Sequence, residues 1–194
     1  PDEAARMQIM IPAKRGVDEE EAKKLVGTAR TLTERYPNSA AVLLTATEAE
    51  FDVRNFDGAE KLADRVLAID PKSVDAAIYR AQVDLMRSRE DPSKLVEARR
   101  KFIAANNMKS DHAFPLYGYY LTHLFDESTT VVPEAAKAAL ESAFAYAPFD
   151  QGVRRAIIYS LLTEDRTIEA RVVGASYLAG NGGYACMLRK KFEA

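Results

Sequence analysis

Hydrophobic side chains recur along this chain at the spacing of amphipathic α-helices. Leu25, Val26, Ala29 and Leu32, for example, return every three or four residues, with polar residues between them. This spacing gathers apolar side chains on one face of a helix. It predicts helices over residues 17–36, 40–53, 56–69, 74–87, 93–106, 112–125, 134–146, 150–163 and 167–178, and a short, degenerate one within 3–11.

The endings of the predicted helices repeat at a nearly constant interval. They fall at Pro37, Pro71, Ser110, Pro148 and Gly182, at intervals of 34, 39, 38 and 34 residues. Proline and glycine stop helices, and a fixed period of this length is typical of helical-repeat proteins. The residues twelve and five positions before each ending are small or apolar: Leu25, Ala59, Ala98, Ala136 and Ala170, then Leu32, Val66, Ala105, Ala143 and Tyr177. Seven residues make nearly two turns, so we expect each pair on one packed face.

The helices are joined tightly enough that neighbours must be antiparallel. We therefore predict one helical-repeat domain over residues 1–194. Its repeats are expected at about 6–37, 40–71, 74–110, 111–148 and 151–182, with a C-terminal cap or tail at 183–194. The links 88–92 and 126–132 hold the extra residues of the longer repeats. Ser39 and Asp111 are expected to cap the helices that follow them.

The segment 40–71 resembles the tetratricopeptide repeat, a pair of antiparallel helices. The matching residues are Leu43, Leu44, Ala46, Phe56, Ala59, Val66, Leu67 and Pro71. Thr47 stands where the family usually has a small residue, and Glu50 where an aromatic is common. Residues 111–148 match less closely, through Phe114, Gly118, Ala136, Ala143 and Pro148. The resemblance implies an all-α fold, a right-handed superhelix of antiparallel helix pairs.

In this family the concave surface, lined by the first helix of each pair, commonly binds extended peptides or partner helices. The resemblance implies groove positions at Leu44, Glu48, Phe51, Ile78, Gln82, Leu85, Pro115, Tyr119, Thr122, Arg155, Tyr159 and Leu162, with Ala41 beside them. Tyr117 and Tyr120 are expected to pack between neighbouring pairs instead. Members that grip a C-terminal carboxylate use Lys, Arg and Asn on successive first helices, which Leu44, Glu48, Ile78 and Gln82 replace here. An apolar or mixed peptide is therefore the expected ligand.

Charge and composition narrow the classes of partner. The chain has 27 basic and 29 acidic residues, which gives no reason to expect a nucleic acid. Basic clusters at 99–101, 154–155 and 189–191 fall on different helices and are expected to be solvated. No stretch approaches the roughly 20 apolar residues that span a bilayer, so we predict a soluble chain without membrane insertion.

Candidate catalytic and metal-binding residues are sparse. His112 and His123 are eleven residues apart on one predicted helix, about 16 Å at 1.5 Å per residue, which prevents shared ligation of one metal ion. Cys186 is the only cysteine. No nucleophile elbow, zinc-binding histidine pair or phosphate loop occurs. We therefore expect no cofactor and no metal. A helical enzyme using Asp111, His112, Tyr119 and His123 is a less favoured alternative.

The favoured interpretation is a noncatalytic scaffold that binds a protein or peptide partner, or another domain of its own longer chain, through the concave surface. The alternative is a structural helical-repeat extension of an enzyme whose catalytic domain is absent from this chain. It is motivated by the start at Pro1, ahead of the first methionine, Met7. Self-association through exposed apolar residues is a further alternative.

Overall fold

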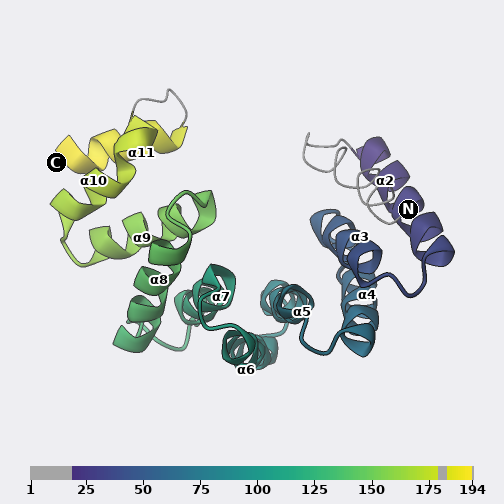
Figure 1. Cartoon of the computed structure of the whole chain (residues 1–194). Coiled ribbons are helices and arrows are strands. Elements are labelled where there is room, and N and C mark those ends of the chain that lie inside the picture. Colours follow the sequence, from purple (N-terminus) through teal and green to yellow (C-terminus); the bar gives the residue numbers. More distant parts are fainter. Residues whose placement is uncertain (1–18, 179–182, 194) are drawn as a thin grey trace. The chain divides into compact units, whose positions relative to one another are not determined.

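The computed structural model describes residues 19–178 and 183–193, which contain ten α-helices and no strand (Figure 1). The helices are α2 Glu19–Arg35, α3 Ala40–Asp52, α4 Phe56–Ile69, α5 Val74–Arg87, α6 Ser93–Met108, α7 Ala113–Leu124, α8 Glu134–Tyr146, α9 Gln151–Thr163, α10 Thr167–Leu178 and α11 Gly183–Glu193. The nine helices predicted between residues 17 and 178 are confirmed, with ends within two residues. The short helix predicted within 3–11 lies outside the described residues.

Four helices that open a pair, α3, α5, α7 and α9, each follow a residue whose side chain accepts a backbone N–H from the first helical turn. The Oγ atoms of Ser39 and Ser73 accept from Val42 and Ala76 at 3.3 and 3.4 Å. Asp150 Oδ1 accepts from Val153 at 2.9 Å. Such caps satisfy donors that have no partner within the helix, and they fix the residue at which each helix starts.

The cap predicted at Asp111 is wrong. The residue in the N-cap position of α7 is His112, whose Nδ1 accepts from Phe114 N at 3.4 Å, and its backbone is extended (φ −102°, ψ 123°). Asp111 is exposed, one residue outside the helix. Both residue types can accept this hydrogen bond, and the one that stands next to the first helical residue provides it.

The contacts divide the chain into two compact units, with the boundary in the sequence between Ser110 and Asp111. In unit 1, α3 packs against α4, α4 against α5, α5 against α6, and α2 against α3. In unit 2, α7 packs against α8, α8 against α9, α9 against α10, and α10 against α11. The single domain over 1–194 stays a prediction.

The packed positions predicted from the repeat are confirmed. Nine of the ten are buried, and only Tyr177 is half-buried. Ala59, Ala98, Ala136 and Ala170, which share one position in four successive second helices, have no exposed surface. Since a methyl group is the whole side chain there, the neighbouring helix can approach closely.

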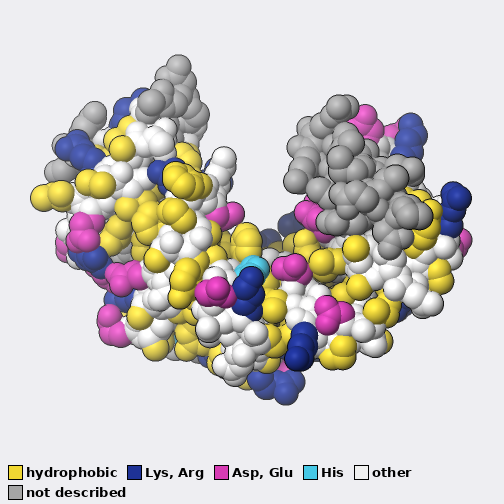
Figure 2. All heavy atoms as spheres, in the orientation of Figure 1, with side chains coloured by type: hydrophobic (Ala, Val, Ile, Leu, Met, Phe, Trp, Pro, Cys, Tyr) yellow, Lys and Arg dark blue, Asp and Glu magenta, His cyan; other side chains and the backbone are white. Residues whose placement is uncertain are grey.

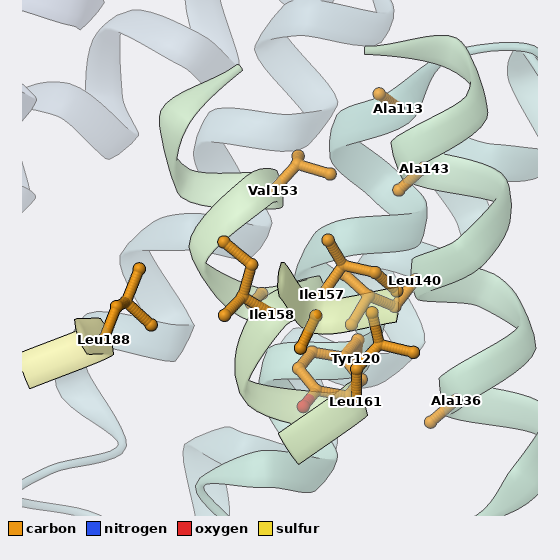
Figure 3. Close-up of a cluster of buried hydrophobic side chains, with 12 residues drawn as sticks. Ala113, Tyr120, Ala136, Leu140, Ala143, Val153, Ile157, Ile158, Leu161 and Leu188 are labelled. Carbon is orange, nitrogen blue, oxygen red and sulfur yellow. The ribbon is translucent and has the colours of Figure 1, made fainter. Parts of the chain in front are cut away.

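The core of unit 2 surrounds one tyrosine. Figure 3 shows Tyr120, Leu140, Ile157 and Leu161 pointing toward one another from α7, α8 and α9. Leu188 of α11 belongs to the same cluster and is fully buried. The C-terminal segment, expected to be a cap or a frayed tail, is thus a packed helix over the described residues Gly183–Glu193.

Unit 1 also buries two carboxylates, each eleven residues after the cap of its helix. Glu50 accepts from Asn55 Nδ2 at 2.7 Å and from Arg30 Nε at 3.3 Å. Asp84 lies 2.5 Å from Lys101 Nζ. Glu50 is therefore more than a departure from the family pattern, because it joins α2, α3 and the turn after α3. Buried charges persist only when they are paired in this way.

Removing buried volume from unit 2 should destabilise it. We expect Leu140→Ala to lower the free energy of unfolding by about 2–5 kcal/mol, since Leu140 is fully buried. Val172→Ala, at a position 72% exposed, is the control and should change it by less than about 0.5 kcal/mol. Urea denaturation followed by circular dichroism measures both. Equal losses would contradict the assigned core.

Removing Lys101 from the ion pair with Asp84 should leave the carboxylate of Asp84 buried without its partner. We expect Lys101→Ala to cost about 1–3 kcal/mol, and the double variant Asp84→Ala, Lys101→Ala to cost less than the two single variants combined. Glu97→Ala, which breaks an exposed pair with Arg100 on the same helix, should cost much less than Lys101→Ala. Additive losses at Asp84 and Lys101 would show that the two residues are not coupled.

Candidate protein-interaction surface

The four N-caps give the first helices a common register. The candidate groove residues of α3, α5 and α9 lie five, nine and twelve residues after their caps: Leu44, Glu48 and Phe51; Ile78, Gln82 and Leu85; Arg155, Tyr159 and Leu162. In α7 the same positions belong to Tyr117, Leu121 and Leu124, because the cap is His112. The sequence-based candidates in α7, Pro115, Tyr119 and Thr122, therefore lie two residues out of register.

Burial explains what the α7 candidates do. Pro115 is buried, and Thr122 is fully buried with its hydroxyl donating to Tyr119 O at 2.7 Å. Tyr119 is half-buried, and its ring meets the His123 ring edge-on at 4.9 Å. Pro115 and Thr122 thus offer little side-chain surface to a partner, and the sequence pattern missed Tyr117, Leu121 and Leu124, which are half-buried.

The first-helix face of unit 1 is partly apolar and carries carboxylates. Leu44, Glu48, Phe51 and Gln82 are half-buried, whereas Ile78 and Leu85 are buried. The Phe51 ring lies 5.6 Å from the Phe56 ring and 5.7 Å from the Tyr79 ring, measured between centroids. Burial raises the pKa of Tyr79, and the negative charges of Glu48, Asp52 and Asp75 raise it further. The carboxylates of this face therefore lie close enough to Tyr79 to oppose ionisation of its phenol.

The corresponding face of unit 2 is more exposed and carries a cation. Arg155 is exposed, Tyr159 is 53% exposed and Leu162 is half-buried. The Arg155 guanidinium carbon lies 5.4 Å from the centre of the Tyr184 ring of α11, a cation–π contact. On the side of the molecule drawn in Figure 2, exposed hydrophobic side chains lie among dispersed charges of both signs.

Tyr117 of α7 packs closely against Gly152 of α9. A Cβ atom at Gly152 would lie 3.2 Å from Tyr117 Oη. Burial raises the pKa of the Tyr117 phenol, and the charge of Asp150 adds to the rise while Arg155 opposes it. The expectation that Tyr117 packs between neighbouring pairs is met on one side of its ring, where it contacts α9.

Unit 2 also contains a cavity of about 300 Å³. It is lined by Tyr120, His123, Leu124, Thr129, Thr130, Val131, Val132, Lys137, Tyr159, Ser160, Thr163 and Glu164. Lys137 Nζ lies 2.8 Å from Glu134 and 3.0 Å from Glu164. The hydrogen bond from Lys137 is the main cause that lowers the pKa of Glu164. The charged groups of the cavity are therefore paired with each other.

The side chains considered as candidate catalytic or metal-binding residues have separate roles in the structure. His112 serves as a helix cap and His123 contacts Tyr119, while Cys186 is exposed on α11. Among residues 19–178 and 183–193, three or more His, Cys, Asp or Glu side chains do not gather in the arrangement that holds a metal ion. No helix in the same ranges has the length and apolar character to cross a bilayer.

The Tyr117 phenol should be visible in a pH titration. Its raised pKa means that the folded state favours the neutral phenol, so stability falls as pH rises above the ordinary value of 10.0. We expect Tyr117→Phe to remove one phenol from those that ionise late, as followed by the ultraviolet absorbance of phenolate. In urea, where both chains are unfolded, the titration of the variant should differ from that of the unmodified chain only by the absence of one phenol. An unchanged late phase would contradict this assignment.

Comparison with known proteins shows similarity in structure alone. No protein-family model and no curated protein matches the sequence. Among solved structures, the chain is similar to TTC0263, a thermophilic TPR protein of Thermus thermophilus, with a TM-score of 0.72 and 14% identity over 100% of this chain and 97% of that one. MamA (residues 41 to the end) from Desulfovibrio magneticus RS-1 gives a TM-score of 0.60 and 14% identity over 100% and 97%. A double mutant of MamA RS-1 gives 0.57 and 14% over 96% and 95%.

These similarities extend over nearly the whole of each chain and agree with the all-helical fold. The expected all-α fold is confirmed: this chain is a tetratricopeptide-like α-solenoid.

Proposed function

We propose that this chain is a noncatalytic scaffold that binds an extended segment of another protein along its first helices. The observation that carries this proposal is Tyr159, a large aromatic side chain that is 53% exposed in the middle of α9. It stands nine residues after the cap, a position that the other first helices fill with Glu48, Gln82 and Leu121. Tyrosine combines a large apolar ring with a hydroxyl, and it is enriched at the centres of protein interfaces.

The residues around Tyr159 support the proposal. Arg155 precedes it by one helical turn and Leu162 follows it by nearly one, so the three side chains lie along one face of α9. Side chains at this spacing can contact successive residues of a bound segment. Leu44 and Phe51 give the corresponding face of unit 1 a partly exposed apolar surface. A surface that mixes apolar, polar and charged groups suits a peptide better than it suits a purely apolar ligand.

Selection from a random peptide library displayed on phage tests the proposal directly. We expect the whole chain to enrich peptides of related sequence. Tyr159→Ala should weaken the enriched peptides about tenfold or more, a loss of about 1.4 kcal/mol or more that is typical of an interface anchor. Fluorescence anisotropy with labelled peptides measures the change.

Ile168→Ala provides the matched control, because Ile168 is 82% exposed but belongs to the second helix α10. Its peptide affinity should stay within about twofold of the unmodified chain, since exposed substitutions away from a site have small effects. Circular dichroism verifies that both variants are folded. Absence of any enriched peptide, or equal losses in the two variants, would argue against the proposal.

A further inference from the structure

We infer that Arg155, which lies over the Tyr184 ring and on the helix face that Tyr117 approaches at Gly152, binds an acidic side chain of the partner segment. This inference rests on the proposed function, because it assigns a specificity to one position of the same face. The three side chains come from α7, α9 and α11, all within unit 2. They form the acidic-residue subsite, the name used below for Tyr117, Arg155 and Tyr184.

The helix geometry of α9 sets the order of these side chains. Gly152, Arg155 and Tyr159 lie at i, i+3 and i+7, so they share one face of the helix. Tyr117 contacts this face at Gly152, where a Cβ atom would be 3.2 Å from its hydroxyl. Tyr184 lies beside Arg155, with its ring centre 5.4 Å from the guanidinium carbon. One cation thus contacts the ring of Tyr184 and shares a helix face with Gly152, which Tyr117 approaches.

Arg155 has no carboxylate partner in the part of the chain that the structure describes. Its hydrogen bond within the protein, from Nη2 to Gln151 Oε1, is long at 3.5 Å. Arg166 in the same unit contacts three carboxylates, those of Glu141, Glu164 and Glu169. Arg154 donates to Val173 O at 2.7 Å. Arg155 therefore keeps most of its donors available to a ligand, and its planar group suits a carboxylate held by two hydrogen bonds.

The acid closest in sequence to this subsite is already used in the fold. Asp150 influences Tyr117 electrostatically, but its Oδ1 accepts the N–H of Val153 as the cap of α9. The hydroxyl of Tyr117 is protonated at neutral pH, since the ordinary pKa of a phenol is 10.0 and burial raises it further, so it can donate to a carboxylate. Contact with the Tyr184 ring also restricts the motion of the guanidinium, which lowers the cost of ordering it on binding.

A carboxylate side chain fits this subsite better than a nucleic acid. A polyanion requires several cations along one surface, whereas the neighbouring Arg154 is committed to a carbonyl of α10 and to the Tyr177 ring. The equivalent face of unit 1 has carboxylates around Tyr79, namely Glu48, Asp52 and Asp75. An acidic residue of the partner would be attracted at Arg155.

The peptides selected from the random library provide the probe. We expect an Asp or Glu to recur at one position of the enriched sequences. Replacing it by Asn or Gln in a synthetic peptide should weaken binding to the unmodified chain about 5- to 20-fold, as expected for a charge-assisted hydrogen bond. With Arg155→Gln the acidic and amide peptides should bind equally well. Fluorescence anisotropy gives the four affinities.

Arg171→Gln is the matched control. Arg171 is also exposed and also lies over an aromatic ring of α11, that of Phe192 at 5.7 Å, but it belongs to α10. It should keep the full preference for the acidic peptide. Circular dichroism checks that both arginine variants fold.

The outcomes separate this inference from the proposed function. Enriched peptides without a recurring acid, or an acidic preference that survives in Arg155→Gln, would overturn the subsite and leave peptide binding intact. A preference lost equally in Arg171→Gln would reduce it to general charge attraction and overturn it as well. Failure to enrich any peptide would overturn both proposals.

Discussion

The structure depends on close approach of neighbouring helices at alanine. Ala59, Ala98, Ala136 and Ala170 have no exposed surface, and they recur at one position of α4, α6, α8 and α10. A larger side chain at any of them would push two helices apart, because protein interiors leave no space for additional atoms. Small residues at the contacts also leave little room for large ones in the core. Tyr120 and Phe102 are nevertheless fully buried, whereas Tyr159 is 53% exposed at the surface, where it is accessible to a partner.

A core of this kind obtains part of its order from polar contacts. Glu50 and Asp84 occupy the same position of α3 and α5, eleven residues after the cap, but their partners differ. Glu50 is held by Arg30 and Asn55, from α2 and the turn after α3, whereas Asp84 is held by Lys101 of α6. A carboxylate with a fixed partner accepts one arrangement of neighbouring helices and penalises others. Buried pairs of this type thus favour one arrangement of the helices, whereas contacts between alanine side chains alone would allow several.

The sequence was sufficient to predict where the helices lie, but not to predict which side chains of α7 share the register of the other first helices. Prolines, caps and alanine spacing are local signals, so the bounds of α4, α5, α8 and α10 could be predicted to the residue. The start of α7 could not, because Asp111 and His112 are adjacent and either can cap a helix. The candidate groove positions Pro115 and Thr122 lie two residues out of the register set by His112, and the structure buries both. The structure instead puts Tyr117 in the register of Arg155.

The acidic-residue subsite shows why a site can be hidden in a sequence that predicts its fold. Tyr117 and Arg155 each stand five residues after a cap, so a correct register places them at equivalent positions of α7 and α9. Tyr184 has no such signal, since α11 is the short helix that follows the last pair, and only the structure shows its ring beside Arg155. The near balance of 27 basic and 29 acidic residues hides the local contrast as well. A cation at Arg155 can therefore attract an acidic segment to unit 2 although the chain as a whole carries a formal net charge of −2.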